Sequence, residues 1–500
     1  MNTKQLRQKI LDLAIRGKLV PQDPNDEPAS VLLERVRAEK ERLIREGKIK
    51  RDKRDSAVSR GDDKLHYENV PFEVPESWCW ATLNEVCSVL TDGTHQTPTY
   101  SDDGYIFLSS KNVTTGKIDW DNVMHIPESL HNELHSRLAP EIGDILLAKN
   151  GTTGFAAVVD RECIFDIYVS LALLRTFKNE ISPEYLRHII SSQNVQEHFK
   201  GHLKGIGVPN LHLEHIRTAP IPVCSLAEQC RIVAAIESAF AVIDEIERNK
   251  SDLQAAVTAA KSKILSLAIR GKLVPQDPAD EPASVLLERI CAEREALVKA
   301  GKIKRGKGDS VIEKSCDNSY YENLPDGWDL CRLNDIGQIV GGGTPSTTEP
   351  SFWDNGSIPW ITPADLSGYN AKYIAAGNRM ITTTGLSESS AVLMPADSVL
   401  FSSRAPIGYC VIAKNEVCTN QGFKSVVPFL SGMSEYIYHY LKARVEEIRS
   451  RASGTTFKEV SGTEFGNTVI TLPPIAEQRR IVEAIEVAFN QLNQVTENLD

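Results

Sequence analysis

The sequence lacks the features that mark membrane, secreted or zinc-stabilised proteins. Its 500 residues contain no apolar run near the roughly 20 residues that span a bilayer, and the N-terminus MNTKQLRQKI lacks the apolar core of a signal peptide. The ten cysteines are scattered, with no CxxC pair and no Cys/His cluster at zinc-ligand spacing. We therefore expect a cytoplasmic protein with no membrane contact, structural zinc or disulfide framework.

Signatures of catalysis are missing as well. The chain has no GxxxxGK[ST] loop for a nucleotide-driven motor, no NPPF or NPPY motif for amino-methyl transfer and no HExxH motif. Ten of its 11 histidines fall between His66 and His215, which invites a metal or acid/base function there. Solvated or hydrogen-bonded histidines are the favoured interpretation. We predict no catalytic residue, no bound metal and no cofactor on this chain.

Positive charge is also scarce. With 56 basic and 67 acidic residues the net charge is -11, which argues against DNA binding because phosphate-binding proteins usually carry a basic footprint. The charge is unevenly distributed: residues 1–64 hold 17 basic and 12 acidic side chains, whereas 65–225 hold 11 and 20. The basic runs at 48–54 and 302–307 could bind phosphate, although such runs are more often solvated faces or protein-docking sites.

The dominant positive feature is an internal repeat. Residues 9–51 return at 263–305 with 34 of 43 positions identical, at an offset of 254 residues. A second pair, 225–246 and 474–495, has an offset of 249. Together, the two offsets indicate that the chain consists of two half-units arranged as a nearly closed circle. The two ends of the chain fall within one of the two long helical segments, as if the circle were cut there. One helical region lies mid-chain, and its partner would be assembled from the two termini.

The repeated parts carry strong helix signals. Residues 228–270 contain no proline or glycine, and apolar or small residues recur at steps of 3 and 4. This pattern predicts a single helix about 65 Å long. Matching apolar seams at 482–499 and 6–13 favour an antiparallel two-helix coiled coil under a pseudo-two-fold axis; burial in two separate globular cores is the alternative. Second helices are expected at 27–46 and 281–300, ended by glycines at 47 and 301.

Two dissimilar blocks, 75–224 and 325–473, lie between the repeated parts. Apolar runs such as ILLA at 145–148 and SVLF at 398–401 predict short strands, whereas 182–199 and 434–452 each predict a helix. Each block is therefore expected to be a mixed α/β domain, which places the chain in the α/β class. The predicted domains are 1–64, 65–224, 225–310, 311–473 and 474–500.

Candidate ligand contacts lie where the blocks are richest in Gly, Ser, Thr and amide side chains. Lys and Arg can bond guanine, Asn and Gln can bond adenine, and hydroxyls or loop amides can bind phosphate oxygens. The alternative is that many of these residues only form turns. The candidates in the first block are Thr94, His95, Gln96, Thr97, Ser109, Ser110, Lys111, Asn112, Lys149, Asn150 and Thr152. Those in the second are Gly342, Gly343, Thr344, Ser346, Thr347, Thr362, Asp365, Ser402, Ser403, Arg404, Asn420, Gln421 and Lys424.

As a set, three motifs resemble a known family. The AEQxxIVxAI signature after each block, LAIRGKLVPQDP with its ASVLLER helix, and the GGTPST…IPWITPADL run are similar to the specificity (S) subunit of type I restriction-modification enzymes. The resemblance covers essentially the whole chain. It implies two target recognition domains, each of which reads one half of a split double-stranded DNA sequence, held apart by the coiled coil.

The same resemblance implies partners. Such subunits join two modification (methyltransferase) subunits, which bind S-adenosylmethionine, and further restriction (motor and nuclease) subunits. ATP and Mg²⁺ are expected on the partners as well, so that this chain would be a non-catalytic reader. The acidic balance predicts that the chain alone binds DNA poorly and that partners supply much of the phosphate neutralisation. A coiled-coil adaptor whose variable domains bind proteins, and a stand-alone enzyme using the histidine-rich block, are the competing functions.

Overall fold

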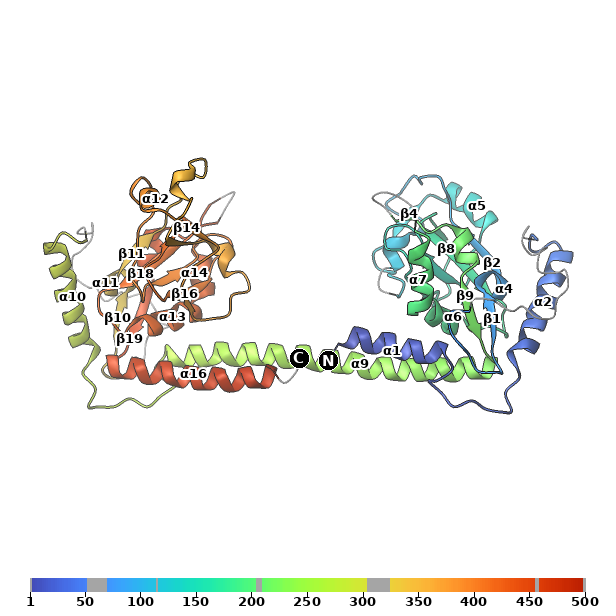
Figure 1. The fold of residues 1–500 in the computed structure, drawn as a ribbon, viewed down its shortest axis with the longest axis horizontal. Helices are drawn as coiled ribbons and strands as arrows, with labels where there is room; N and C mark the ends of the chain where they lie inside the picture. The colour runs from blue at the N-terminus through green and yellow to red at the C-terminus, as the bar shows by residue number, and fades with distance from the viewer. Residues whose placement is uncertain are drawn as a thin grey trace. The chain divides into compact units, whose positions relative to one another are not determined.

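The computed structural model describes residues 2–51, 70–113, 116–203, 209–303, 324–454 and 458–497. The chain separates into two compact units, Met1–Asn249 and Lys250–Asp500, and Figure 1 labels many of their elements. None of the helices within the described ranges combines the length and the hydrophobicity that a membrane span requires. Residues 52–54 and 304–307 of the two basic runs lie outside the described residues.

The first unit contains a mixed α/β domain with two sheets and a strand pair. Its larger sheet is antiparallel, in the order β2 (Cys87–Asp92), β8 (Leu171–Thr176), β5 (Ile145–Ala148) and β6 (Ala156–Val158). The smaller sheet has the order β4 (Met124–Ile126), β3 (Tyr105–Leu108) and β7 (Phe165–Ile167), with β3 parallel to β7. An antiparallel pair joins β1 (Cys79–Thr82) and β9 (Pro220–Val223).

Helices precede, interrupt and follow these strands. They are α1 (Thr3–Ile15), α2 (Ala29–Arg45), α4 (Leu83–Val86), the 3-10 turn η1 (Ser110–Val113), α5 (Glu128–Arg137), α6 (Pro183–Ile190), α7 (Gln193–Gly201), α8 (Leu213–Arg217) and α9 (Leu226–Ala268). The last of these, α9, continues from the first unit into the second.

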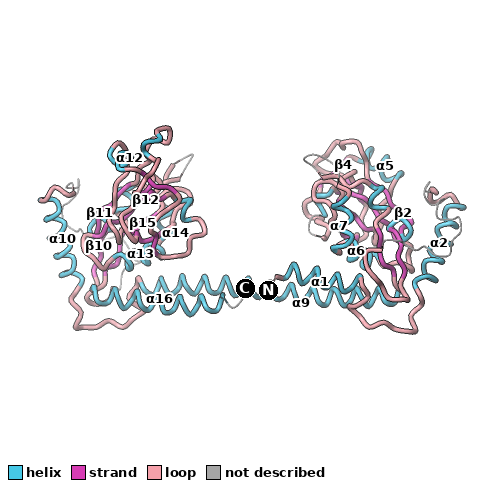
Figure 2. The backbone as a smooth tube through the Cα atoms, in the orientation of Figure 1, coloured by secondary structure: helices cyan, strands magenta, loops and turns pink. Residues whose placement is uncertain are grey.

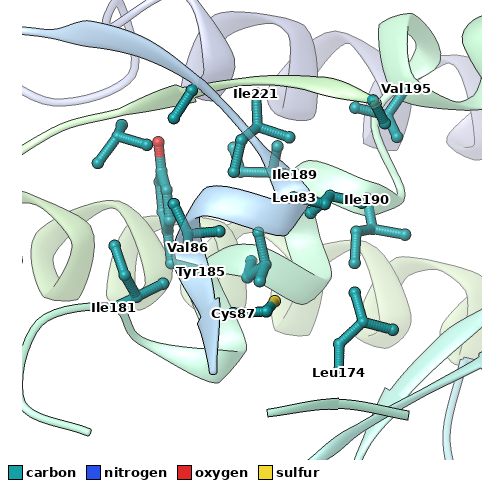
Figure 3. Packing of buried hydrophobic residues seen from close by; sticks show 14 of the residues in the cluster. Leu83, Val86, Cys87, Leu174, Ile181, Tyr185, Ile189, Ile190, Val195 and Ile221 are labelled. Atoms are coloured by element: carbon teal, nitrogen blue, oxygen red, sulfur yellow. The ribbon is translucent and has the colours of Figure 1, made fainter. Parts of the chain in front are cut away.

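Strand β5 shows why the larger sheet is covered on both faces. All four of its residues are buried, as the continuous apolar run predicts. Because successive side chains of a strand point to opposite faces, Ile145 and Leu147 pack into one core while Leu146 and Ala148 pack into another. The first core also holds residues of α4 and α6, including Tyr185, whose packing is seen in Figure 3. The second core lies toward β3 and β7.

The second unit repeats this plan with different strands. Its larger sheet has the order β11 (Gly337–Gly341), β18 (Lys424–Pro428), β15 (Val399–Phe401), β16 (Cys410–Ala413) and β13 (Tyr373–Ile374). The smaller sheet has the order β14 (Arg379–Ile381), β12 (Ile358–Ile361) and β17 (Cys418–Thr419), and β10 (Asp329–Arg332) pairs with β19 (Val469–Leu472). The α/β class predicted for both blocks is confirmed.

The helices of the second unit follow the same order. They are α10 (Ala283–Lys299), α11 (Leu333–Ile336), the 3-10 turns η3 (Pro350–Phe352) and η4 (Pro363–Leu366), α12 (Thr383–Ser387), α13 (Ser434–Ala443), α14 (Val445–Ser450), α15 (Gly462–Gly466) and α16 (Ile475–Glu497).

The helices of the repeated parts agree with the sequence. The helix predicted at 228–270 is α9, and the two predicted second helices are α2 and α10. Gly47 and Gly301 follow α2 and α10 with φ of 70° and 68°, the left-handed conformation that a glycine adopts just after a helix. The repeated sequence therefore specifies the C-terminal ends of α2 and α10 as well as their positions in the chain.

Two segments predicted as single helices are each broken, so those predictions are wrong. Segment 182–199 forms α6 and α7, and segment 434–452 forms α13 and α14. At the first break the Ser192 hydroxyl donates to the Ile189 carbonyl (2.6 Å) and the Ser192 backbone is extended, with φ -68° and ψ 152°. A serine side chain that bonds the local backbone competes with helix continuation, whereas apolar periodicity runs across the break unchanged.

Each unit pairs one terminal helix with its own part of α9 (Figure 2). In the first unit Arg7 of α1 donates to Asp244 of α9 at 2.6 Å. In the second unit Lys261 of α9 donates to Asn493 of α16 at 2.6 Å and lies 5.6 Å from the ring centre of Phe489. The partnership of α9 with helices from the two termini follows the sequence prediction; the supercoiling of a coiled coil stays a prediction.

One polar anchor recurs in both units at the AEQ motif. Glu228 accepts hydrogen bonds from the indole of Trp78 (2.9 Å) and from Gln22 (2.5 Å), and burial raises the pKa of its carboxyl. In the second unit Glu477 accepts one from the indole of Trp328 at 2.8 Å. Both glutamates are almost fully buried. A single buried carboxylate therefore ties together the first and last segments of each α/β domain.

Candidate nucleic-acid interface

In the first unit the candidate segments meet at strand ends. The backbone N–H of Thr94 donates to the carbonyl of Ile167 (3.1 Å), and that of Lys149 donates to the carbonyl of Ser170 (2.9 Å). The Ser170 hydroxyl accepts from the N–H of Ser110 (3.0 Å). The end of β7 and the loop that follows it thus hold the three candidate segments in one cluster, although the sequence of 167–170 carries no pattern that singles it out.

A buried ion pair lies beneath this cluster. The ammonium of Lys149 is 3.1 Å from a carboxylate oxygen of Asp92, and the two side chains are only 7% and 10% exposed. His95 places Nε2 3.4 Å from the other oxygen of Asp92 and keeps 69% of its side chain exposed. Lys149 is therefore committed to the interior, whereas His95 remains accessible to a ligand.

The other candidates of the first unit also divide into buried and accessible side chains. Asn112 is buried, accepts the N–H of Ser109 (2.9 Å) and donates to the carbonyl of Asn122 (3.0 Å), which is turn formation rather than ligand contact. Thr94 is also buried, and Ser109, Ser110 and Asn150 are half-buried. The exposed candidates are His95, Gln96, Thr97, Lys111 and Thr152.

In the second unit four candidate segments converge in a comparable way. Backbone hydrogen bonds join Gly343 to Thr419 (2.9 Å), Asn420 to Ile361 (3.0 Å) and Ser403 to Gly422 (2.7 Å). The hydroxyl of Thr344 also donates to the side-chain oxygen of Gln421. Ser346, Thr347 and Gln421 are exposed, and the cluster again forms where β11, β12, β15 and β17 end.

The same backbone contact closes both clusters. A Cβ added to Gly93 would lie 2.0 Å from the carbonyl oxygen of Ile167, and one added to Gly342 would lie 1.9 Å from that of Asn420. Neither position has space for any side chain. Glycine therefore lets the segment after β2 approach the end of β7 in the first unit, and the segment after β11 approach the segment after β17 in the second. Gly342 therefore has a backbone role among the predicted contact residues.

Two cations of the second cluster share one carboxylate. Glu459 accepts from Arg404 at 2.8 Å and from Lys424 at 3.1 Å. Although partial burial raises the pKa of Glu459, the hydrogen bonds from Lys424 and Arg404 lower it overall. The buried hydroxyl of Ser402 donates to the carbonyl of Pro406 at 2.7 Å. Arg404 remains 43% exposed, whereas Lys424 and Ser402 are directed inward.

Thr362 and Asp365 form a local cap. Asp365 accepts the N–H of Thr362 (2.8 Å) and its hydroxyl (2.7 Å), and its second oxygen accepts the N–H of Asn378 (2.9 Å). Burial raises the pKa of Asp365, but these hydrogen bonds lower it overall. The carboxylate is thereby occupied in holding the start of η4, the behaviour expected of a capping box.

One accessible cation escaped the sequence prediction. The guanidinium of Arg379, on β14, lies 3.5 Å from the ring centre of Trp353, and the Trp353 indole donates to the carbonyl of Ser346 at 2.8 Å. Arg379 is exposed. It therefore places a positive charge beside the 341–347 loop. The stack joins residues distant in sequence, and no motif or periodicity connects them.

The fold contains two similar α/β modules, and comparison with known proteins assigns the chain to a family. The type I restriction modification DNA specificity domain matches twice, at residues 75–254 and 325–499. The chain therefore belongs to the family of type I restriction-modification specificity subunits.

Two curated relatives and one solved structure illustrate the similarity. The EcoAI specificity subunit of Escherichia coli is 33% identical in an alignment 391 positions long; the match spans 68% of this chain and 63% of that relative, just under two thirds of its length. The EcoEI specificity subunit of Escherichia coli is 28% identical in an alignment 563 positions long, which spans 99% of this chain and 90% of that relative. A chain from a solved type I R-M system has a TM-score of 0.56 at 20% identity over 86% of this chain and 94% of its own, a likeness of fold.

Proposed function

We propose that this chain is the DNA-reading subunit of a type I restriction-modification complex, and that each α/β domain reads one half of a bipartite double-stranded target. The observation that carries the proposal is the clustering of exposed polar side chains at strand ends in both units. Gln96 and Gln421 have the amide groups that bond adenine, and Arg379 and Arg404 have the guanidinium that bonds guanine or phosphate. The buried members of each cluster would hold these groups in position.

Charge pairing supports a reader that depends on partners. Lys149 is neutralised by Asp92, and Glu459 neutralises part of the charge of Arg404 and Lys424. DNA affinity rises with the number of phosphates that a protein neutralises, so cations that are already paired with a carboxylate, such as Lys149 and Lys424, gain little from phosphate contact. We therefore propose that modification subunits supply most of the phosphate contacts in the assembled complex.

The repeated helices are proposed as the docking and spacing frame. Residues 9–51 and 263–305 keep 34 of 43 positions identical while the domains between them differ, which suits two copies of one modification subunit. Restriction subunits would join the same complex, with S-adenosylmethionine, ATP and Mg²⁺ held by the partners. We further propose that α9 forms an antiparallel coiled coil with α1 and α16, and that its length sets the gap between half-targets in a pseudo-two-fold, circularly organised subunit.

A domain exchange tests this function. Residues 75–224 would be replaced by the matching block of another specificity subunit, the chimera expressed with modification subunits, and methylated genomic sites mapped by sequencing. One half of the target should change and the other should persist. The reciprocal exchange of 325–473 is the matched control, since it should change only the other half. An unchanged target, or a change in both halves from one exchange, would refute domain-by-domain reading.

A further inference from the structure

Two histidines and an aspartate gather on the first unit, on residues that were not among the candidate DNA contacts. His131 and His135 are four residues apart on α5 and therefore share one face of the helix. Asp166 lies in the middle of β7, between Phe165 and Ile167, which both pack into the domain core. Because strand side chains alternate, Asp166 points to the opposite face, toward α5.

The three side chains converge within a small space. A nitrogen or oxygen atom from each lies within 4.8 Å of those from the other two. Nδ1 of His131 is 2.7 Å from one oxygen of Asp166, and Nδ1 of His135 is 3.6 Å from the other. The Tyr105 ring stacks on His131, with ring centres 3.7 Å apart, which fixes the orientation of that imidazole.

Two of these polar atoms are unsatisfied. Among the described residues, Nδ1 of His135 and Oδ1 of Asp166 are buried and have no hydrogen-bond partner. Asp166 is only 2% exposed, and burial raises the pKa of its carboxyl against the opposing effects of His131 and His135. A buried carboxylate oxygen and a buried imidazole nitrogen that face each other without a bond are costly, and a water molecule or a cation between them would remove that cost.

We propose that His131, His135 and Asp166 form a binding site for a divalent transition-metal ion, of which Zn²⁺ is the best match. Two imidazoles and one carboxylate are ligands that zinc prefers, and tetrahedral ligands about 2.0 to 2.2 Å from zinc lie about 3.3 Å apart. The 3.6 Å gap between His135 and Asp166 is close to that separation. His131 would exchange its hydrogen bond to Asp166 for a bond to the ion.

The surroundings supply a route for the ion and a free ligand position. The His135 side chain is 32% exposed, whereas those of His131 and Asp166 are 8% and 2% exposed. An ion would therefore enter past His135, and water would complete a four-coordinate site. Three protein ligands from α5 and β7 would attach the helix to the strand.

The bound ion would also position the candidate DNA loop. Arg137, at the end of α5, donates to the carbonyls of Asp92 and Gly93, both at 3.4 Å. These two residues precede Thr94 and the exposed His95. Fixing α5 against β7 would thus restrain the backbone that leads into this loop. Metal binding itself does not depend on the proposed DNA function, so either can fail without the other.

Zinc binding by the full-length chain tests the proposal. After dialysis against EDTA and removal of the chelator, calorimetric titration with ZnCl₂ should show one tight equivalent per chain. His135→Gln should weaken that equivalent by at least about 100-fold, since it removes one of three protein ligands. The matched control is His202→Gln, because His202 belongs to a second histidine cluster, with His198 and His215, in the same unit. This control should bind zinc as the wild type does.

Three outcomes would overturn the site: no tight zinc equivalent in the wild type, wild-type affinity in H135Q, or loss of the equivalent in H202Q. Thermal unfolding in EDTA shows whether H135Q is folded. If it is not, X-ray absorption at the zinc edge of the wild-type chain decides the question. Two imidazole ligands with oxygen donors support the site, whereas three imidazoles or none contradict it.

Discussion

His439 is expected to make the second unit sensitive to acid. It lies on α13, is 5% exposed, and meets the ring of Phe489 edge-on with centres 6.3 Å apart. Neither of its ring nitrogens has a hydrogen-bond partner among the described residues. Burial, reinforced by Lys372 and Lys442 and opposed by Glu435, lowers the pKa of His439 from 6.5 to about 3. Between about pH 3 and pH 6.5 this imidazole is therefore neutral in the folded chain and protonated in the unfolded chain.

The sign and size of the effect follow from proton linkage. Below about pH 6.5 the unfolded state binds a proton that the folded state does not bind until about pH 3. His439 therefore leaves the free energy of unfolding unchanged above about pH 6.5. Below that pH it lowers the free energy of unfolding by about 1.4 kcal/mol for each pH unit. At about pH 5 this one side chain should have lowered the free energy of unfolding by about 2 kcal/mol.

The variant His439→Leu removes the titrating group and keeps an apolar side chain against Phe489. Urea unfolding of the full chain at about pH 7 and about pH 5 should show a loss on acidification that is about 2 kcal/mol smaller in H439L than in the wild type. Ile437→Val, at a fully buried position of the same helix, is the control, since it should cost about 1 kcal/mol at both pH values. An equal acid loss in wild type and H439L would refute the reasoning.

Two further predictions concern the repeated frame. Gly17 has φ of 63°, and an added Cβ would lie 2.5 Å from Cγ of Pro75, so Gly17→Ala should lower the free energy of unfolding by about 2 kcal/mol or more. Gly47→Ala, with φ of 70° and no atom within 4 Å, should cost only about 1 kcal/mol; equal losses in urea unfolding would contradict the contact argument. Inserting four residues after Asn249 lengthens α9 by about 6 Å and should widen the gap between half-targets in methylation maps. An unaltered gap would count against the spacing role of α9.

Local signals in the sequence were sufficient for most of the frame. The absence of proline and glycine from 228 to 270 predicts α9, and Gly47 and Gly301 predict the ends of α2 and α10. These features act within a few residues, so the sequence alone determines them. The break at Ser192 was missed because it depends on one side-chain hydrogen bond, to which apolar periodicity is insensitive.

The candidate interface was less predictable because its chemistry depends on partners distant in sequence. The segments rich in Gly, Ser, Thr and amide residues do converge, but Lys149 is buried by its pairing with Asp92, a residue 57 positions earlier. The stack of Arg379 on Trp353 likewise joins β14 to the end of η3. Composition marks where loops lie, whereas tertiary pairing decides which side chains remain accessible.

The boundary at Asn249 has a consequence for how the protein is made. Each compact unit is contiguous in sequence, and α1 packs with Ile232 and Ile236 of α9, which belong to the same half of the chain. Domains generally fold as units, the N-terminal one first, during synthesis. The first unit can therefore assemble its core on the ribosome before synthesis of the second unit is complete. A design that paired α1 with the far terminus would instead leave its apolar face exposed until the last residues emerged.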